Sequence, residues 1–167
     1  MDFRTREAKE TDLTRIIEIY NATIPSRMVT ADTEPVSVKS RKWFEEHDSQ
    51  NRPLWVLETE SGEIGAWISL NSFYGRPAYQ KTAEMSVYVD EKLRGNGIGT
   101  RLAQSMINRC DEYNVTTIVG FVFAHNAPSL ALTKKLGFEH WGYLPEVAEL
   151  DGEKRDLVIL GLKFDQR

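Results

Sequence analysis

Hydrophobic and polar residues alternate along this chain with two different periods, and the switches between them predict short strands and helices in turn. Residues 2–7 are predicted to form a strand. From Thr11, which suits a helix N-cap, apolar residues recur every three or four positions, as on the buried face of a helix. A second helix is predicted after Pro35. Two apolar runs then flank a Ser-Gly pair and predict a hairpin of residues 54–59 and 64–70.

The C-terminal half begins with a period-two run from Thr82 to Val89, which predicts a strand. A glycine-rich turn follows, and an amphipathic helix is predicted to start near Gly97. The remaining predicted elements are a strand at residues 116–123, a helix at 127–136, and a hairpin of residues 138–149 and 155–163 across an Asp-Gly turn. No linker, repeat or low-complexity run interrupts the series, so a single domain over residues 1–167 is predicted.

Charge and hydropathy exclude two classes of partner. The 167 residues carry 21 basic and 25 acidic side chains and a net charge of −4, which offers no basic field for nucleic acid. The longest apolar runs are far too short to span a bilayer, and the first residues lack the apolar region of a secretory signal. We therefore expect a cytoplasmic protein whose partners are small molecules, with no nucleic acid and no membrane among them.

Several side chains with reactive potential are interpreted as structural. The lone cysteine, Cys110, falls near the end of the helix that starts around Gly97, on an apolar stripe, with no histidine nearby in sequence to activate it. We interpret it as a packed, inert thiol. The three histidines show no spacing typical of metal ligands, so no metal site is expected. Each tryptophan lies in a periodic apolar element and is predicted to be in the core: Trp43, Trp55, Trp67 and Trp141.

The glycine turn after Val89 is the first candidate for ligand binding. Glycines at alternate positions of residues 94–99 let the backbone turn sharply, and the helix that follows adds unpaired N–H groups and a positive dipole end. These groups suit a phosphate or pyrophosphate. The glycine spacing excludes a dinucleotide fingerprint, and the missing Gly-Lys-Ser/Thr excludes a Walker loop. The alternative is a plain connection, because short glycine turns often bind nothing.

Downstream, Asn126 can cap a short helix, Pro128 suits its first turn, and Gly137 suits its left-handed end. Together the motif Arg94-x-x-Gly97-x-Gly99 and the segment 126–138 resemble the coenzyme A motifs of the GCN5-related N-acetyltransferase (GNAT) family. The resemblance implies an α/β fold with a central, mixed but mostly antiparallel sheet of about seven strands and four helices. In that fold two central strands splay apart around acetyl-CoA, which serves as co-substrate.

Four further segments, residues 20–24, 30–35, 73–79 and 83–89, resemble the phosphinothricin and methionine sulfoximine acetyltransferase branch. That resemblance implies direct transfer of acetyl, in a ternary complex, to the α-amine of a small amino acid analogue such as methionine sulfoximine, methionine sulfone or phosphinothricin. A homodimer is usual in this branch. Two alternatives stay open: acetylation of a protein N-terminus or lysine, and a regulatory domain that binds acetyl-CoA without turnover.

The family resemblance also assigns cofactor contacts. It implies that backbone groups of Val87 and Val89 hold the pantetheine arm, and that an N–H near Val87 meets the thioester oxygen as charge builds there. The residues matched to cofactor binding are Val87, Tyr88, Val89, Arg94, Gly95, Asn96, Gly97, Ile98, Gly99, Thr100, Asn126, Ser129 and Lys135.

Acetylation of an amine requires a base, because an alkylammonium must lose a proton before its nitrogen attacks the thioester. Strand alternation places Glu84, Ser86 and Tyr88 on one face, and the matching glutamate of the branch is proposed as that base, so the role is carried to Glu84. The alternative is that Glu84 is only a surface charge that favours solubility.

His125 is a second candidate base or a hydrogen-bonded structural residue. Thr133 stands where the family often has a tyrosine acid, which leaves the general acid unassigned.

Substrate recognition is expected from loops near the thioester end. An aromatic-rich segment stands just ahead of Glu84, and Arg76 within it offers a planar fork suited to a carboxylate or phosphinate. The alternative is a solvated charge. A second loop resembles a substrate-covering segment of the same branch. The residues matched to substrate binding are Phe73, Tyr74, Gly75, Arg76, Tyr79, Thr33 and Glu34.

Overall fold

The computed structural model describes residues 2–39 and 42–164, and within those ranges it shows one seven-stranded sheet. The spatial order is β1-β2-β3-β4-β5-β7-β6, and every neighbouring pair is antiparallel except β4 and β5. The strands are β1 (Arg4–Glu7), β2 (Leu54–Glu58), β3 (Ile64–Ser72), β4 (Thr82–Val89), β5 (Thr117–Phe123), β6 (Glu139–Leu150) and β7 (Glu153–Lys163). This mixed, mostly antiparallel sheet confirms the predicted fold class.

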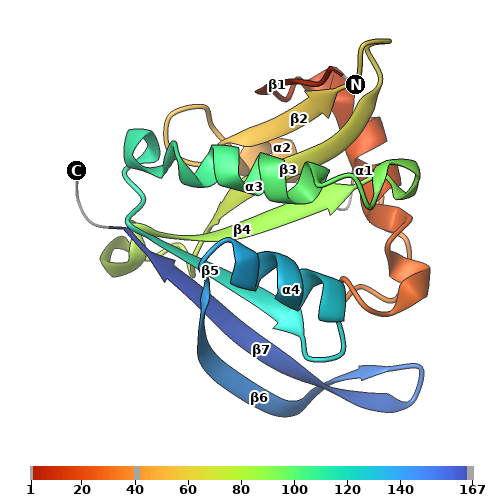
Figure 1. The fold of residues 1–167 in the computed structure, drawn as a ribbon, viewed down its shortest axis with the longest axis vertical. Coiled ribbons are helices and arrows are strands. Elements are labelled where there is room, and N and C mark those ends of the chain that lie inside the picture. Colours follow the sequence, from red (N-terminus) through yellow and green to blue (C-terminus); the bar gives the residue numbers. More distant parts are fainter. Residues whose placement is uncertain (1, 40–41, 165–167) are drawn as a thin grey trace.

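Helices cover both faces of the sheet. They are α1 (Leu13–Asn21), α2 (Trp43–Glu46), α3 (Ile98–Ile107) and α4 (Ala127–Lys135). In Figure 1, α3 and α4 lie in front of the sheet, and α1 and α2 lie behind it. A 3-10 turn of Glu10–Asp12 precedes α1, so the prediction of Thr11 as its N-cap was wrong. Among the described residues, no helix is long and apolar enough to cross a membrane.

Strand alternation divides the core into two parts. Met85, Val87 and Val89 of β4 pack against the apolar cluster that contains the buried face of α3. Tyr88 points to the other face and packs against the cluster that contains α1. The ring of Tyr88 stacks on Trp67, with centroids 4.7 Å apart. Strand β4 therefore separates an α3 side from an α1 side of the molecule.

The second predicted helix is shorter than expected. It is confined to α2, and residues 36–39 are not helical. The side chain of Asn21 explains this, because its Nδ2 donates to the carbonyl oxygen of Val36 at 2.9 Å and its Oδ1 accepts from the Val36 N–H at 3.0 Å. The Val36 carbonyl, which would accept the first bond of a helix that starts here, is thus bonded to a side chain.

Trp141 is not in the core, which corrects the prediction for this tryptophan. It is 41% exposed, whereas Trp55 and Trp67 are each 3% exposed. Trp141 belongs to β6, which within the described part of the chain is an edge strand that pairs only with β7 and has a register shift between His140 and Gly142. Its ring lies flat on Gly161 of β7, where a Cβ would come within 2.0 Å of the indole. The periodic pattern indicated a strand but could not indicate that this strand is an edge.

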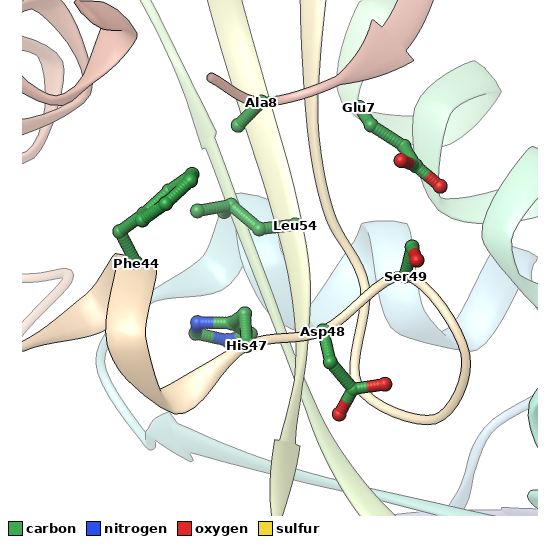
Figure 2. Close-up of a pocket in the computed structure, with 7 residues that line it drawn as sticks. All are labelled: Glu7, Ala8, Phe44, His47, Asp48, Ser49 and Leu54. Atoms are coloured by element: carbon green, nitrogen blue, oxygen red, sulfur yellow. The ribbon is translucent and has the colours of Figure 1, made fainter. Parts of the chain in front are cut away.

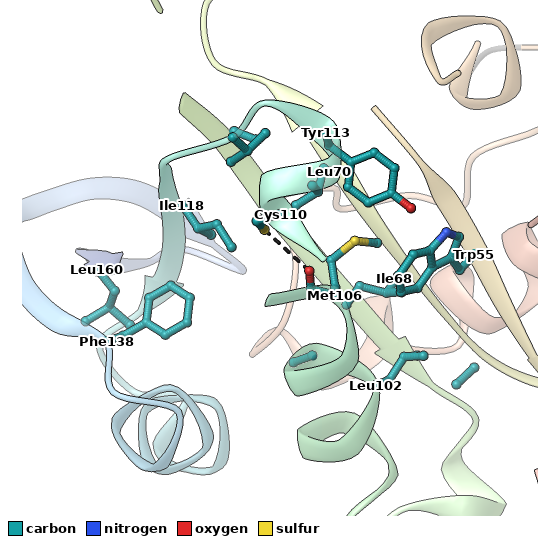
Figure 3. Packing of buried hydrophobic residues seen from close by; sticks show 14 of the residues in the cluster. Trp55, Ile68, Leu70, Leu102, Met106, Cys110, Tyr113, Ile118, Phe138 and Leu160 are labelled. Atoms are coloured by element: carbon teal, nitrogen blue, oxygen red, sulfur yellow. Dashed lines mark hydrogen bonds between the residues drawn. The ribbon is translucent and has the colours of Figure 1, made fainter. Parts of the chain in front are cut away.

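Cys110 begins a 3-10 turn, Cys110–Tyr113, just after α3 ends. The residue is 1% exposed, and its Sγ donates to the carbonyl oxygen of Met106 at 3.4 Å. Figure 3 shows this bond inside the apolar cluster. Burial raises the pKa of the Cys110 thiol to about 12, so the thiolate that would react is scarce at neutral pH. The geometry fits a packed, inert thiol.

Candidate active site

The two central strands separate, as the predicted fold requires. Strands β4 and β5 pair at three positions, which end with Glu84 opposite Val119. Beyond that point β4 continues its pairing with β3 to Val89, and β5 continues with β7 to Phe123. In Figure 1 the two strands diverge toward the start of α3. We call the V-shaped gap between them the splay, with its apex at Glu84.

Hydrogen bonds at the ends of β4 show which backbone groups face the splay. The Lys81 carbonyl accepts from the N–H groups of residues 116 and 117 on the β5 side, and the Asp90 N–H donates to Gly65 on the β3 side. Because successive residues of a strand direct their backbone groups to opposite edges, Val87 and Val89 face the splay. The structure does not place Tyr88 with them, since its backbone groups face β3.

The same reasoning identifies the opposite edge of the splay. The N–H of Ala124 donates to Asp156, and the N–H of Phe164 donates to Thr116, so the even-numbered residues of β5 face β7. Phe121 and Phe123 therefore direct backbone groups toward β4. Strand groups without a ladder partner favour a ligand that carries amides, as the pantetheine arm does.

At the wide end of the splay lies the glycine turn. Gly95 and Gly97 have φ values of +80° and +73°, and a Cβ placed on either would meet no other atom within 4 Å. The first backbone bond of α3 runs from the Arg101 N–H to the Gly97 carbonyl at 3.0 Å. The preceding N–H groups of Ile98, Gly99 and Thr100 have no acceptor within the helix. This positive helix end and the open glycine turn form a site for an anion.

Packing holds the glycine turn beside β4 and α4. A Cβ on Gly99 would lie 3.3 Å from Leu132 and 3.6 Å from Val89, so a glycine here lets α3 start close to both elements. Arg94 Nε donates to the Val89 carbonyl at 3.4 Å, and Asn96 Nδ2 donates to the Leu93 carbonyl at 3.1 Å. The guanidinium of Arg94 thus lies at the end of β4, next to the anion site.

The start of α4 is tied to the segment that follows α1. Asn126 caps α4 by accepting from the Ser129 N–H at 3.2 Å, and its Nδ2 donates to the Met28 carbonyl at 3.0 Å. His125 Nε2 lies 2.8 Å from the Arg27 carbonyl, which can only accept, so this nitrogen donates. These bonds favour the structural interpretation of His125 over a base. Lys135 is exposed in the last turn, roughly 9 Å along the helix axis from Ser129.

Glu84 stands at the apex of the splay. Its side chain is half-buried, and within residues 2–39 and 42–164 its carboxylate makes no hydrogen bond or ion pair. Burial raises the pKa of Glu84 above the usual value for a glutamate. A carboxylate with a raised pKa is a stronger base, and the position of Glu84 at the narrow end of the splay suits a reaction at the tip of a ligand.

The hydroxyl of Thr133 is hydrogen-bonded within its own helix, α4. Its hydroxyl lies 2.9 Å from the Ser129 carbonyl and 3.0 Å from the Leu130 carbonyl. Both oxygens can only accept, so they compete for the single proton of the hydroxyl. The geometry gives Thr133 no role as a proton donor, and the general acid remains unassigned.

The aromatic-rich segment forms one compact loop between β3 and β4. The ring centroid of Phe73 lies 4.4 Å from that of Tyr74 and 5.5 Å from that of Tyr79. Tyr74 and Gly75 both have positive φ values, of 55° and 60°, which turn the chain at the tip. Arg76 follows, exposed, and within the described part of the chain its guanidinium has no hydrogen bond or ion pair. A cation beside three aromatic rings is therefore available to a ligand.

Thr33 and Glu34 lie on a different loop. Arg27 Nη1 donates to the Thr33 carbonyl at 2.8 Å, and Arg27 Nε contacts Asp151 at 2.9 Å, at the tip of the β6–β7 hairpin. Among the described residues, no hydrogen bond or ion pair joins this loop to the loop of residues 73–79. The ring contacts thus bring Phe73, Tyr74 and Tyr79 together, and Thr33 and Glu34 belong to a separate loop.

Three polar residues near Glu84 were missed by sequence reasoning. Asn71 is the direct cross-strand neighbour of Glu84, and His47 Nε2 lies 2.8 Å from Asn71 Oδ1. Arg52 is 9% exposed and donates through Nη2 to the Gln80 carbonyl at 2.7 Å, so it ties β2 to the end of the aromatic loop. Strand register places Asn71, whereas His47 follows α2 and Arg52 precedes β2, so contacts between distant parts of the chain place these two, and the sequence pattern carries no signal of them.

A pocket of about 190 Å³ lies at the β1 edge of the sheet, behind His47. Figure 2 shows His47 and Phe44 on one side of it and the end of β1 on the other. Its lining residues are Glu7, Ala8, Phe44, His47, Asp48, Ser49 and Leu54. None of the residues predicted to bind cofactor or substrate lines this pocket, so it is separate from the splay.

Two sequence relatives align with almost the whole chain. A Bacillus subtilis protein named "Putative phosphinothricin acetyltransferase YwnH" is 50% identical over 157 residues, which are 93% of this chain and 96% of that protein. The L-methionine sulfoximine/L-methionine sulfone acetyltransferase of Pseudomonas aeruginosa is 31% identical over 166 residues, which are 99% of this chain and 96% of that protein.

Comparison with solved structures and with family models points to the same group of acetyltransferases. The crystal structure of a GNAT superfamily phosphinothricin acetyltransferase from Sinorhizobium meliloti, in complex with AcCoA, superposes with a TM-score of 0.91 at 25% identity and covers 99% of this chain and 90% of that one. The model of the Acetyltransferase (GNAT) family matches residues 14–138, which include the splay and the glycine turn. The chain therefore belongs to the GNAT acetyltransferase family.

Proposed function

We propose that this protein transfers acetyl from acetyl-CoA to the α-amine of a small amino acid analogue, such as methionine sulfoximine, methionine sulfone or phosphinothricin. One observation carries the proposal: pairing of β4 with β5 ends at Glu84, while the glycine turn and the start of α3 lie at the wide end. An extended ligand with a phosphate at one end would then reach a half-buried carboxylate with the other.

The residues divide the chemistry between the two ends. The N–H groups at the start of α3, with Arg94 beside them, would hold the pyrophosphate. Backbone groups of Val87 and Val89 would pair with the pantetheine amides, and the N–H near Val87 would donate to the thioester oxygen as charge builds on it. Glu84 would accept the proton of the substrate ammonium, directly or through water, before the amine nitrogen attacks. Water would supply the proton for the departing thiolate.

The aromatic loop supports the substrate class. Three rings of this loop and the exposed Arg76 form a surface that suits an amino acid analogue with a carboxylate or phosphinate. The relatives whose names specify such substrates support the same assignment.

Peptide N-termini are the competing substrates. An assay that compares free amino acid analogues with peptides, with coenzyme A release as readout, separates the two classes of substrate.

We also propose a homodimer. Strand β6 is an edge of the sheet and exposes four large apolar side chains, which are Trp141, Tyr143, Leu144 and Val147. Val147 is 55% exposed, and a charge there should weaken any contact between copies. Light scattering should give twice the chain mass for the wild type and a lower mass for Val147→Asp. A monomeric wild type would refute the proposal.

Binding of acetyl-CoA should raise the melting temperature, because a ligand of the native state stabilises it by about 2.7 kcal/mol at roughly 100 times its dissociation constant. Gly97→Asn should abolish this shift, since its side chain would occupy the open space in front of α3. Gly62→Asn is the matched control, because Gly62 also has a positive φ, +83°, and open space but lies in the β2–β3 turn. A wild type without any shift would contradict the binding site.

Glu84→Gln should lower the rate at neutral pH by about 10²- to 10⁴-fold, because the amide keeps the shape but cannot accept a proton. Acetyl-CoA binding should be unchanged, and the rate should recover in part at high pH, where the free amine is abundant. Glu149→Gln, an exposed strand glutamate, is the control and should keep full activity. Wild-type turnover by Glu84→Gln would assign the base to another group.

Arg76→Ala should reduce kcat/KM by roughly ten- to a hundred-fold for substrates with a free acid group, the value of one charge-assisted hydrogen bond. The loss should be small for the matching neutral amides or esters. Arg4→Ala, which removes an exposed arginine on β1, should affect neither type. Equal losses on acidic and neutral substrates would show that Arg76 only shapes its loop.

A further inference from the structure

Asn71 forms a side-chain bridge across β3 and β4. In the strand register it stands directly opposite Glu84. Its Nδ2 lies 3.2 Å from Ser69 Oγ, 3.2 Å from Ser86 Oγ and 3.4 Å from the Glu84 carbonyl oxygen. One amide therefore contacts β3 once and β4 twice, next to the proposed base.

The Asn71 bridge lies at the point of the sheet where the β4–β5 ladder ends. Up to Glu84, β4 has a strand on each side, and after Glu84 it keeps only β3. A strand that loses one ladder depends on the other for its position, because each ladder bond restrains the backbone on that side. Asn71 adds its contacts to Glu84 and Ser86 at the residue where the β5 ladder stops.

The Glu84 carbonyl fixes which way the Asn71 amide faces, and His47 contacts the other end of the amide. The Glu84 carbonyl can only accept, so the Asn71 NH₂ group faces β4 and its Oδ1 faces His47. His47 Nε2 lies 2.8 Å from that Oδ1, and His47 Nδ1 contacts the Trp43 carbonyl of α2. Both oxygens can only accept, so the two bonds form together only when both ring nitrogens carry a proton. Figure 2 shows His47 at the end of α2, beside Leu54. The bridge is thus anchored to an element outside the sheet.

We propose that Asn71, held by His47, is the positioning residue for Glu84: it fixes β4 at the apex of the splay, so that the carboxylate stays beside the thioester end of the cofactor. The inference rests on the proposed function, in which Glu84 is the base. Asn71 contacts the Glu84 backbone and not its carboxylate, so its effect on the reaction is indirect. Loss of the bridge should therefore slow proton transfer without weakening the binding of acetyl-CoA.

The kinetic test compares Asn71→Ala with Ser72→Ala, the next residue of β3, whose side chain points to the other face. Well below the melting temperature, Asn71→Ala should lower kcat about tenfold and leave the KM for acetyl-CoA within about twofold of wild type. Ser72→Ala should change neither. An unchanged kcat, or a rise in KM equal to the loss in kcat, would overturn the proposal.

His47 provides a second pair of variants that leaves Asn71 in place. His47→Gln keeps a side-chain N–H donor at this position and should retain most of the wild-type kcat. His47→Leu removes the donor and should lower kcat in the same direction as Asn71→Ala. Equal activity of the two His47 variants would show that the bond to Asn71 has no effect on the reaction.

Amide hydrogen exchange tests the positioning without any substrate, so its result does not depend on the proposed activity. In Asn71→Ala the amides of residues 84–86 should exchange faster than in wild type, and those of β2 should be unchanged. Unaltered exchange at residues 84–86 would refute the positioning role. If exchange responds but wild type acetylates no amine, the proposed function has failed and the structural part of the inference stands.

Discussion

The interruption of the ladder between β4 and β5 is the constraint on which the rest of the structure depends. Backbone N–H and C=O groups that have no partner are costly in a folded protein, and here the two central strands leave such groups facing each other. The fold tolerates this because both strands keep a full ladder on their outer edges, β4 with β3 and β5 with β7. The gap is thus framed by rigid elements, and an extended ligand with amides can complete it.

The two ends of the gap differ in charge in the way that the proposed chemistry needs. At the wide end, the unbonded N–H groups of α3 and the guanidinium of Arg94 favour an anion. At the narrow end, Glu84 is half-buried and has no cation among the described residues to lower its pKa. A ligand with a phosphate group would be oriented by this difference alone, with its uncharged tip toward the carboxylate.

Strand β4 also separates the candidate cofactor residues from the candidate base. The apolar side chains on its α3 side anchor the helix whose N-terminus forms the anion site. Its other face carries Glu84 and Ser86, together with the Asn71 bridge and the link through His47 to α2. Because neighbouring positions of one strand point to opposite faces, the residues proposed to bind the cofactor and the residue proposed as the base can be changed independently.

The sequence by itself determined the order of elements, the glycine turn and the cap at Asn126, because these follow from local periodicity and from short motifs. The candidate base, Glu84, came from the resemblance to the acetyltransferase branch. The sequence did not determine which strand is an edge, so Trp141 was wrongly assigned to the core. It also gave no sign of Asn71 beside Glu84, or of the bond that holds Asn71 to His47. Such neighbours are far apart in the chain, and only strand register and helix docking bring them together, since contacts across a sheet leave no periodic pattern in the residues that make them.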